Sequence, residues 1–303
     1  MPITSIYEPV HDELKLVEDS LKSLARVDSP SLINLLGHVL TPQGKRIRPA
    51  LTLLAGRFHN YNLEKLIPMA TAVEMLHTAT LIHDDTIDNS VLRRGRPTAS
   101  SLWSSGIAVL AGDYLFANSA RLVSTTDNVR VMRLFAETLM TICGGELSQS
   151  FASYESSQGR QDYYRRIGQK TASLFSMATE SGAVLSDASE SSIRSLRDYG
   201  YDLGIAFQII DDILDFTGEA AEMGKPVGND LLQGTLTLPA ILLMERHPDD
   251  NPVSKLFGGE DVEKNVNLTV DMIRNSDIIH ESFQIANEFC TKAHHDLTSL
   301  PDC

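Results

Sequence analysis

The sequence has few cysteines, a single tryptophan and no pair of cysteines close together. Its 303 residues contain three cysteines, Cys143, Cys290 and Cys303, which are odd in number and far apart. A disulfide framework is therefore not expected, and neither is a zinc site, because no cysteine belongs to a C-x-x-C pair. Thiols of this kind are typical of a reducing compartment, so we expect a cytoplasmic protein.

Basic residues are also scarce, with 26 Lys and Arg against 40 Asp and Glu and a formal net charge of −14. Nucleic-acid binding needs a basic surface, so no nucleic-acid partner is expected. The N-terminal segment MPITSIYEPVHDELK lacks the apolar run of a signal peptide. No later stretch reaches the roughly 18 uncharged apolar residues of a spanning helix, so we expect no transmembrane segment.

Hydrophobic residues follow a helical period along almost the whole chain. Between residues 63 and 88 they recur at three- and four-residue steps and cover most of the circumference, which is typical of a helix buried among other helices. Similar patterns occur at residues 128–151, 162–185, 192–216 and 265–297. Strand-like patterns are short and isolated, and no linker divides the chain. The pattern predicts one all-α domain, residues 1–303, of about ten or more helices.

Two acidic strings of similar sequence, LIHDDTID and QIIDDILD, end two of these apolar segments. Their aspartates are Asp84, Asp85 and Asp88 in the first string and Asp211, Asp212 and Asp215 in the second. Residues four apart share a helix face, where like charges repel unless a cation binds them. Carboxylate oxygens suit Mg²⁺. One such string is often a solvated helix end, but two copies favour a metal site. Neither string has the glycine and glutamate of an EF-hand loop.

Basic residues gather in two short segments beside Gly/Pro breakers. GKRIRP contains Lys45, Arg46 and Arg48 just before a predicted helix start at Pro49, and VLRRGRPT contains Arg93 and Arg94 after the first acidic string. A guanidinium binds phosphate oxygens in pairs, whereas a lysine acts as a point charge. Isolated basic pairs are usually solvated surface, but in so acidic a chain these clusters favour anion sites.

These motifs resemble those of the trans-isoprenyl diphosphate synthase (polyprenyl synthetase) family, medium- or long-chain type. In family order the chain contains GKRIRP, LIHDDTIDNSVLRRGRPT, GDYL, GGELSQ, QKTASLF, FQIIDDILDF and GKPVGNDLLQGTLTLP. The resemblance covers nearly the whole chain and implies the isoprenoid synthase fold, a helical bundle around a deep central cavity, assembled as a homodimer.

The resemblance implies a prenyltransferase that condenses isopentenyl diphosphate head-to-tail with an allylic diphosphate by ionisation, condensation and elimination. Its cofactor would be Mg²⁺, about three ions per active site with substrate bound. The product would be a linear (E)-polyprenyl diphosphate, and release of this lipid would involve transient contact with a membrane.

The resemblance also assigns roles to individual residues. Catalytic roles fall to Asp84, Asp88, Asp211 and Lys170. The allylic diphosphate would be bound by Arg93, Lys170, Thr171, Gln208 and Lys225. Isopentenyl diphosphate would be bound by Lys45, Arg48, His77 and Arg94. By itself His77 would be interpreted as a core histidine, but it lies seven residues before Asp84 on the same predicted helix.

Small residues one turn before the first acidic string suggest a long product. The growing tail is expected to run beside this helix, where Ala79 and Thr80 leave room, with Leu76, Met75 and Phe135 as the next candidates for a floor. We therefore expect a product longer than about twenty carbons. The alternative is that the small residues let two helices pack closely.

Three other functions remain open from the sequence. A short-chain farnesyl or geranylgeranyl diphosphate synthase would have the same motifs. A class I terpene cyclase usually carries an N/D-S/T-E triad as its second metal motif, where this chain has DDILD. A non-catalytic subunit of a heteromeric synthase usually loses an acidic string, and both are complete here.

Overall fold

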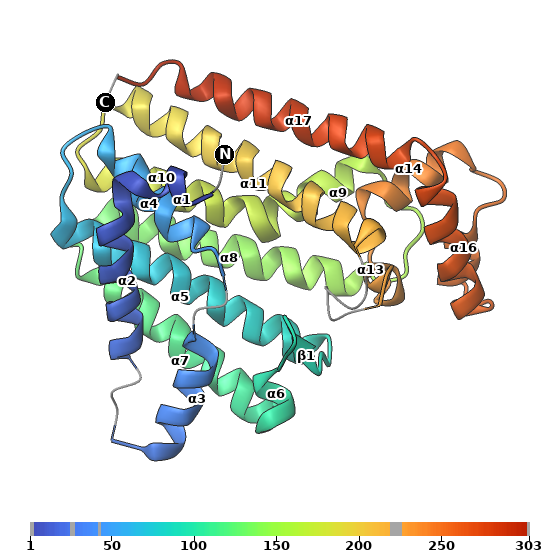
Figure 1. The fold of residues 1–303 in the computed structure, drawn as a ribbon, viewed down its shortest axis with the longest axis horizontal. Coiled ribbons are helices and arrows are strands. Elements are labelled where there is room, and N and C mark those ends of the chain that lie inside the picture. The colour runs from blue at the N-terminus through green and yellow to red at the C-terminus, as the bar shows by residue number, and fades with distance from the viewer. Residues whose placement is uncertain (1–2, 25–27, 42–43, 219–225, 302–303) are drawn as a thin grey trace. The chain divides into compact units, whose positions relative to one another are not determined.

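The computed structural model describes residues 3–24, 28–41, 44–218 and 226–301 of the chain. Within these ranges the fold is all-α apart from one two-stranded hairpin (Figure 1), which confirms the predicted fold class. Two compact units are present. The first comprises Met1–Thr138, Leu174–Gly200 and Asp296–Cys303, and the second comprises Leu139–Ser173 and Tyr201–His295. The single-domain organisation stays a prediction.

The first unit is built mainly from the N-terminal half of the chain. Its complete elements are α1 (Ile3–Ile6), the 3₁₀ turn η1 (Glu8–Val10), α2 (His11–Ser23), α3 (Pro30–Leu40), α4 (Ile47–Arg57), α5 (Leu63–Ile87), β1 (Leu92–Arg93), β2 (Arg96–Pro97), α6 (Ala99–Leu102) and α7 (Ser105–Ser124). Helices with residues in both units are α8 (Val129–Phe151), α10 (Ser173–Leu185), α11 (Glu190–Thr217) and α17 (Ile278–Leu297).

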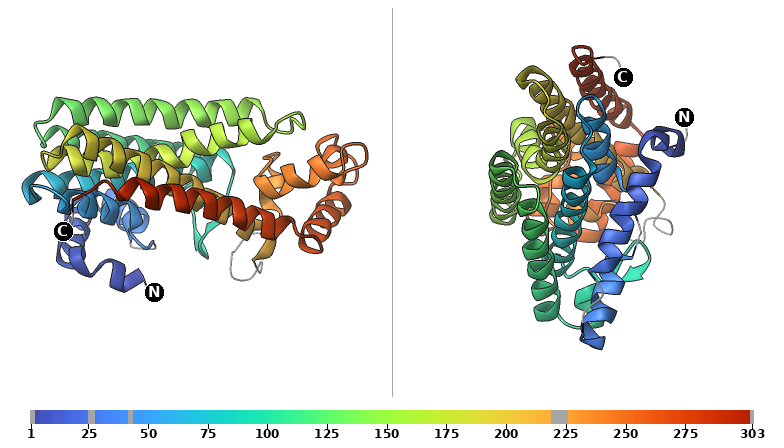
Figure 2. Two further views of the ribbon diagram at one scale, coloured as in Figure 1. Left: turned by 90° about the horizontal axis from the view of Figure 1, so that it is seen from above. Right: turned by 90° about the vertical axis from the view of Figure 1, so that its left-hand side faces the viewer.

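The second unit contains the remaining elements. They are α9 (Arg160–Ile167), the π-helical turn η2 (Gly168–Ala172), α13 (Asn229–Leu232), α14 (Leu238–Arg246), α15 (Pro252–Phe257) and α16 (Val262–Arg274). Figure 2 shows α15 and α16, in orange, packed against each other. The core of the second unit is mainly aliphatic, with Ile209, Ile213 and Phe216 of α11 fully buried among side chains of α13 to α16.

Helix α5 is the central helix of the first unit and packs against α7, α4 and α2. Its buried residues lie all around the helix, as expected for an element with an apolar circumference. Close approach of α7 depends on Gly112, since a Cβ atom there would lie 2.2 Å from Nε2 of His83. The glycine of the GDYL motif therefore sets the spacing beside the acidic end of α5.

The hairpin that follows α5 is a two-residue reversal. Leu92 pairs with Pro97 and Arg93 with Arg96, and the two loop residues, Arg94 and Gly95, have φ of 50° and 75°. Two consecutive positive φ angles are typical of the tight turn whose twist matches that of the flanking strands. The turn therefore fixes the backbone that carries both arginines of VLRRGRPT.

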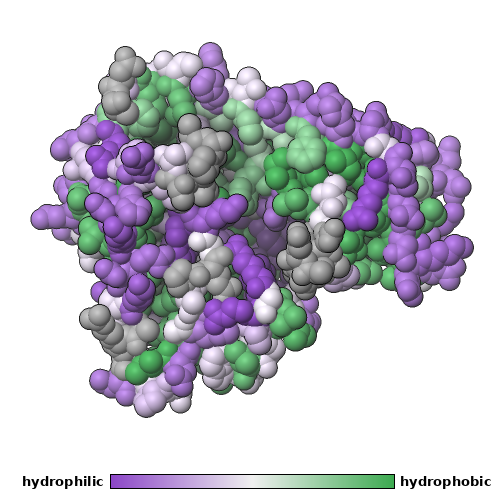
Figure 3. Space-filling model, viewed as in Figure 1, coloured by the Kyte–Doolittle hydropathy of each residue, from purple (hydrophilic) through white to green (hydrophobic). Residues whose placement is uncertain are grey.

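The described surface is mixed in polarity. The face seen in Figure 3 carries purple hydrophilic side chains with green hydrophobic side chains among them. Among the described residues, no helix has the length and apolar content needed to cross a bilayer.

Candidate active site

The first acidic string occupies the last turn of α5 and its C-cap. Asp84 is half-buried, Asp85 is buried and Asp88 is exposed. The carbonyl end of a helix carries partial negative charge, so carboxylates clustered there are unfavourable unless a cation binds them. Their hard oxygen atoms fit Mg²⁺, which is commonly bound by one or two carboxylates together with water and phosphate oxygens.

Asp85 and Arg93 form a close ion pair. The Arg93 Nε–H group donates to both carboxylate oxygens of Asp85, at 2.8 Å each. The Asp85 side chain is 9% exposed. This pair ties the hairpin to the end of α5 and distinguishes Asp85 from its exposed neighbour Asp88. The sequence pattern predicts Asp84 and Asp88 on one helix face, but it does not show that Asp85 is buried against an arginine.

The residues predicted to bind isopentenyl diphosphate converge in the first unit. Burial lowers the pKa of His77 well below its usual value, and the nearby guanidinium groups of Arg48 and Arg94 lower it further. Arg94 reaches the GKRIRP segment, since a Cβ atom on Gly44 would lie 3.2 Å from one terminal nitrogen of Arg94. Lys45 is exposed at the same segment. The result is a strongly cationic cluster beside a neutral histidine, suited to an anion with several charges.

Arg46, the middle cation of GKRIRP, forms ion pairs within the first unit. Its guanidinium donates to the carboxylates of Glu18 on α2 and Glu74 on α5. The side chains of Arg46 and Glu74 are only 14% and 7% exposed. Burial by itself would lower the Arg46 pKa, but the two carboxylates more than offset it and raise the pKa. The Tyr7 hydroxyl also donates to the Lys45 carbonyl oxygen at 2.6 Å. These contacts anchor the segment that carries Lys45.

The second acidic string occupies the last two turns of α11, again near a helix C-terminus. Asp211 is exposed, whereas Asp212 and Asp215 are buried. Burial raises the pKa of both buried carboxyl groups, and the nearby carboxylate of Asp230 raises each further. Asp211 is therefore the member of this string that is open to solvent.

Asp230, which begins the DLLQ part of the last motif, was not singled out from the sequence. Its backbone N–H donates to Oδ2 of Asp215 at 3.3 Å, and the N–H of Gly228 donates to the Asp215 carbonyl oxygen at 3.0 Å. The carboxyl group of Asp215 thus holds the start of α13. The only indication of Asp230 in the sequence was that an acidic residue occurs within the recognised motif GKPVGNDLLQGTLTLP.

Lys170 and Thr171 lie in the π-helical turn η2, a conformation that is often found at functional sites. The Lys170 ammonium lies 2.6 Å from the carboxylate of Glu146, in the GGELSQ motif. Gly145 of that motif faces η2 closely, since a Cβ atom there would lie 2.8 Å from Cβ of Gln169. The GGELSQ motif therefore positions the segment that contains Lys170.

Thr171 and Gln208 are brought together, as their shared predicted role requires. The Thr171 hydroxyl donates to Oε1 of Gln208 at 2.6 Å, and Nε2 of Gln208 donates to Oδ1 of Asp212 at 2.8 Å. Gln208 thus connects η2 to the second acidic string. Lys225, predicted to bind the same diphosphate, lies outside the described residues.

The predicted chain-length residues belong to the packed core of the first unit. Ala79, Met75 and Leu76 are fully buried, Phe135 is 5% exposed and Thr80 is half-buried. The Thr80 hydroxyl donates to the carbonyl oxygen of His77 at 2.8 Å, so its polar atom is satisfied within the helix. An apolar wall next to the first acidic string is consistent with a lipid tail.

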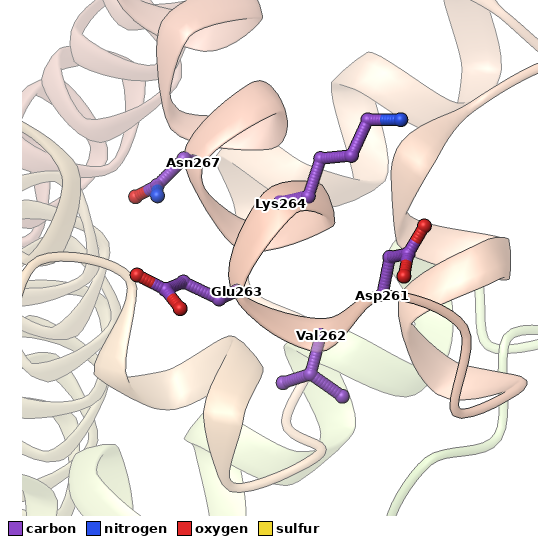
Figure 4. A pocket seen from close by; sticks show the side chains of 5 residues that line it. All are labelled: Asp261, Val262, Glu263, Lys264 and Asn267. Atoms are coloured by element: carbon purple, nitrogen blue, oxygen red, sulfur yellow. The ribbon is translucent and has the colours of Figure 1, made fainter.

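Among the side chains that the structure describes, no three acidic, histidine or cysteine groups converge closely enough to hold a metal ion by themselves. A Mg²⁺ ion that shares its ligands with phosphate oxygens and water does not need such a cluster. A separate open pocket of about 480 Å³ lies at the start of α16. Its lining side chains project in different directions from the helix (Figure 4), and none is a predicted site residue.

Comparison with known proteins identifies the class. Residues 29–272 match the polyprenyl synthetase family. Heptaprenyl diphosphate synthase component 2 of Bacillus subtilis is 36% identical over 301 residues, which cover 99% of this chain and 86% of that protein. The chain is a prenyltransferase, and it belongs to the polyprenyl synthetase family, as the motifs predicted.

Solved structures agree with this assignment. Heptaprenyl diphosphate synthase from Staphylococcus aureus superposes with a TM-score of 0.93 at 36% identity, over 97% of this chain and 93% of that one. A polyprenyl synthase from Caulobacter crescentus CB15, solved with calcium and isoprenyl diphosphate, gives a TM-score of 0.94 at 30% identity, over 100% of this chain and 93% of that one.

Proposed function

We propose that this chain is a Mg²⁺-dependent trans-prenyltransferase that extends an allylic diphosphate with isopentenyl diphosphate to a linear (E)-polyprenyl diphosphate longer than about twenty carbons. The main observation that supports this proposal is that both acidic strings lie at helix C-termini, where clustered carboxylates are unfavourable without a cation. Each string also lies in the same unit as residues suited to binding diphosphate.

Isopentenyl diphosphate is proposed to bind Lys45, Arg48, His77 and Arg94. The lowered pKa of His77 supports this role, because a neutral imidazole can donate one hydrogen bond while the arginines supply the charge. Arg46 supports the site indirectly, since its ion pairs with Glu18 and Glu74 anchor the segment.

The allylic diphosphate is proposed to bind Arg93, Lys170, Thr171, Gln208 and Lys225. Asp84, Asp88 and Asp211, which are exposed or half-buried, are the proposed Mg²⁺ ligands, and Asp85, Asp212 and Asp215 complete the predicted set. Bound Mg²⁺ would supply Lewis-acid stabilisation of the departing diphosphate.

The proposed reaction needs no protein nucleophile. The allylic C–O bond breaks and its electron pair leaves with the diphosphate. The alkene of isopentenyl diphosphate then forms the new C–C bond, and a proton passes to an oxygen of the released diphosphate. Lys170 balances charge on that leaving group, and the apolar wall at Ala79 keeps water from the cation.

Product length is proposed to depend on Ala79 and Thr80, with Leu76, Met75 and Phe135 as the deeper floor. The heptaprenyl products named for the relatives in Bacillus and Staphylococcus support a product of this class. Burial of Ala79 and its neighbours supports an apolar lining at this depth.

We further propose that two copies of the chain associate through α7. Ile107 and Leu110 on this helix are 40% and 68% exposed. Copies that each carry a net charge of −14 repel, so an interface between them needs a weakly charged surface. Helix α7 meets this condition, with Asp113 and Arg121 as its only charged residues.

The molar mass from light scattering tests the proposed dimer. Leu110→Asp should yield monomer, while Leu268→Asp, at a site 44% exposed on α16, should not. The Bacillus relative is named as one component of a synthase, so activity that appears only with a different second protein would replace the homodimer with a heteromer. The cytoplasmic location rests on the scattered cysteines and is part of the same proposal.

An activity assay tests the function. The purified protein is incubated with radiolabelled isopentenyl diphosphate, Mg²⁺ and each allylic primer in turn. We expect products longer than about twenty carbons after dephosphorylation and sizing. Shorter products would indicate a short-chain synthase, and turnover of allylic diphosphate alone would indicate a cyclase. No product from any primer would contradict the proposal for the isolated chain.

A further inference from the structure

A chain of three hydrogen bonds joins α9, η2 and α11 in the second unit. The Tyr163 hydroxyl donates to Oδ2 of Asp212 at 2.7 Å, and Nε2 of Gln208 donates to Oδ1 of Asp212 at 2.8 Å. The Thr171 hydroxyl then donates to Oε1 of Gln208 at 2.6 Å. Two of these four residues, Thr171 and Gln208, are proposed ligands of the allylic diphosphate. Tyr163 has no assigned role.

In the structure the Gln208 amide nitrogen faces Asp212 and its oxygen faces the Thr171 hydroxyl. This orientation suits the ionised form of Asp212, whose two oxygens only accept, one from Tyr163 and one from Gln208. One N–H of the amide is used in this way, and the second N–H remains for another acceptor.

Burial makes this arrangement rigid. Tyr163 is 0% exposed and Asp212 is 4% exposed, so water cannot easily replace either partner. The guanidinium of Arg166 lies over the Tyr163 ring, 5.6 Å from its centroid, and also donates to the carbonyl oxygen of Leu236. The Tyr163 ring is thus fixed on one side by a cation and at its hydroxyl by Asp212.

We infer that Tyr163 and Asp212 are positioning residues that hold the Gln208 amide so that its second N–H meets the allylic diphosphate. The inference rests on the proposed function, because it needs Gln208 as a ligand of that substrate. It gives Asp212 a role distinct from direct metal binding, and it explains why a buried tyrosine lies one helix before the QKT segment.

Tyr163→Phe removes only the hydroxyl and tests the inference. A hydrogen bond to a charged group typically contributes enough to change a rate or binding constant by about tenfold. We expect kcat/KM for the allylic diphosphate to fall about tenfold, while KM for isopentenyl diphosphate and the Mg²⁺ dependence stay unchanged. The matched control is Tyr164→Phe, in which the half-buried neighbouring ring packs against Phe289. That variant should behave as wild type.

A double-mutant cycle separates positioning from a general effect on structure. If Tyr163 acts through Gln208, Tyr163→Phe should cause no further loss in a Gln208→Ala background. Equal losses in both backgrounds would overturn the inference, and so would equal behaviour of the two tyrosine variants in active protein. Wild-type protein that forms no product would instead refute the proposed function first, and this inference with it.

Asp212→Ala gives an independent test if Tyr163→Phe does not fold. Alanine removes both acceptors, so nothing at this position would hold the Gln208 amide nitrogen, and kcat/KM for the allylic diphosphate should fall. The Mg²⁺ concentration for half-maximal activity should stay unchanged. A rise of about tenfold or more in that concentration would mean that Asp212 binds the metal directly.

Discussion

Replacement of Arg46 by Gln should destabilise the protein strongly although the residue is not a proposed substrate ligand. Arg46 bridges Glu18 and Glu74 with a side chain that is 14% exposed, and Glu74 is 7% exposed. Loss of one partner of a buried ion pair typically costs 3–5 kcal/mol, because the remaining charge is left without compensation. The residual exposure of Arg46 places the expected loss near the lower end, at about 3 kcal/mol.

That free energy corresponds to a measurable shift in the melting temperature. Unfolding entropy is about 2.1 cal/mol/K per residue, or roughly 0.6 kcal/mol/K for a chain of this length, so 3 kcal/mol lowers the melting temperature by about 5 °C. Because Arg46 anchors the segment with Lys45, KM for isopentenyl diphosphate should also rise more than KM for the allylic diphosphate.

Arg160 provides a matched control for differential scanning calorimetry. It also bridges two glutamates, Glu245 and Glu281, but its side chain is 38% exposed and theirs are 43% and 31% exposed. Exposed ion pairs contribute about 1 kcal/mol or less, so Arg160→Gln should lower the melting temperature by about 2 °C at most. Equal shifts for the two variants would refute the argument from burial.

Four further outcomes are expected. Asp84→Ala should lower kcat by about a hundredfold or more at saturating Mg²⁺, a loss of about 3 kcal/mol at the transition state, and unchanged turnover would contradict its metal role. Ala79→Phe should shorten the products seen by reversed-phase chromatography, and a wild-type product ladder would contradict the chain-length assignment. Gly182→Ala should lower the melting temperature by several degrees, because the new Cβ atom would lie 2.2 Å from the Thr52 carbonyl oxygen. Gly106→Ala, with no atom within 4 Å of the new Cβ, should not. Burial, with Asp230, raises the pKa of Asp215 to about 8, so ionisation of Asp215 costs stability as pH rises from its unfolded value of about 4. In protein stripped of Mg²⁺ by chelation, the melting temperature of Asp215→Asn should therefore exceed that of wild type increasingly between pH 5 and about pH 8, and a constant difference would contradict this assignment.

Local patterns predicted most helices because burial and helical period coincide in this chain, but the pattern over residues 265–297 is interrupted in the structure, where α16 ends at Arg274 and α17 begins at Ile278. The pattern between residues 63 and 88 corresponds to α5, Leu63–Ile87. The hairpin at residues 92–97 was not predicted, since two-residue strands have no alternation to detect and the turn uses Arg94 before Gly95 instead of the commoner Asn-Gly. The π-helical turn at Lys170 was not predicted either, and Gly145, which faces it closely, is distant in sequence.

The burial of the individual aspartates could not be predicted from residue type. In the sequence Asp84, Asp85 and Asp88 form one motif, yet Asp85 is buried against Arg93 while Asp88 is exposed. Which of three adjacent carboxylates faces solvent depends on the neighbours of the helix, and those neighbours are distant in sequence. Glu74 was a clearer signal that was missed, since a lone acid inside an apolar helix needs a partner, and Arg46 is that partner.

The two-residue hairpin turn gives two consecutive arginines different contacts. Arg93, on the strand, pairs with the end of α5, whereas Arg94, in the turn, lies against Gly44 of the opposite basic segment. Neighbouring side chains in so tight a reversal leave the backbone on different sides. One inserted residue would shift this register, so a variant could keep both arginines and still lose both contacts.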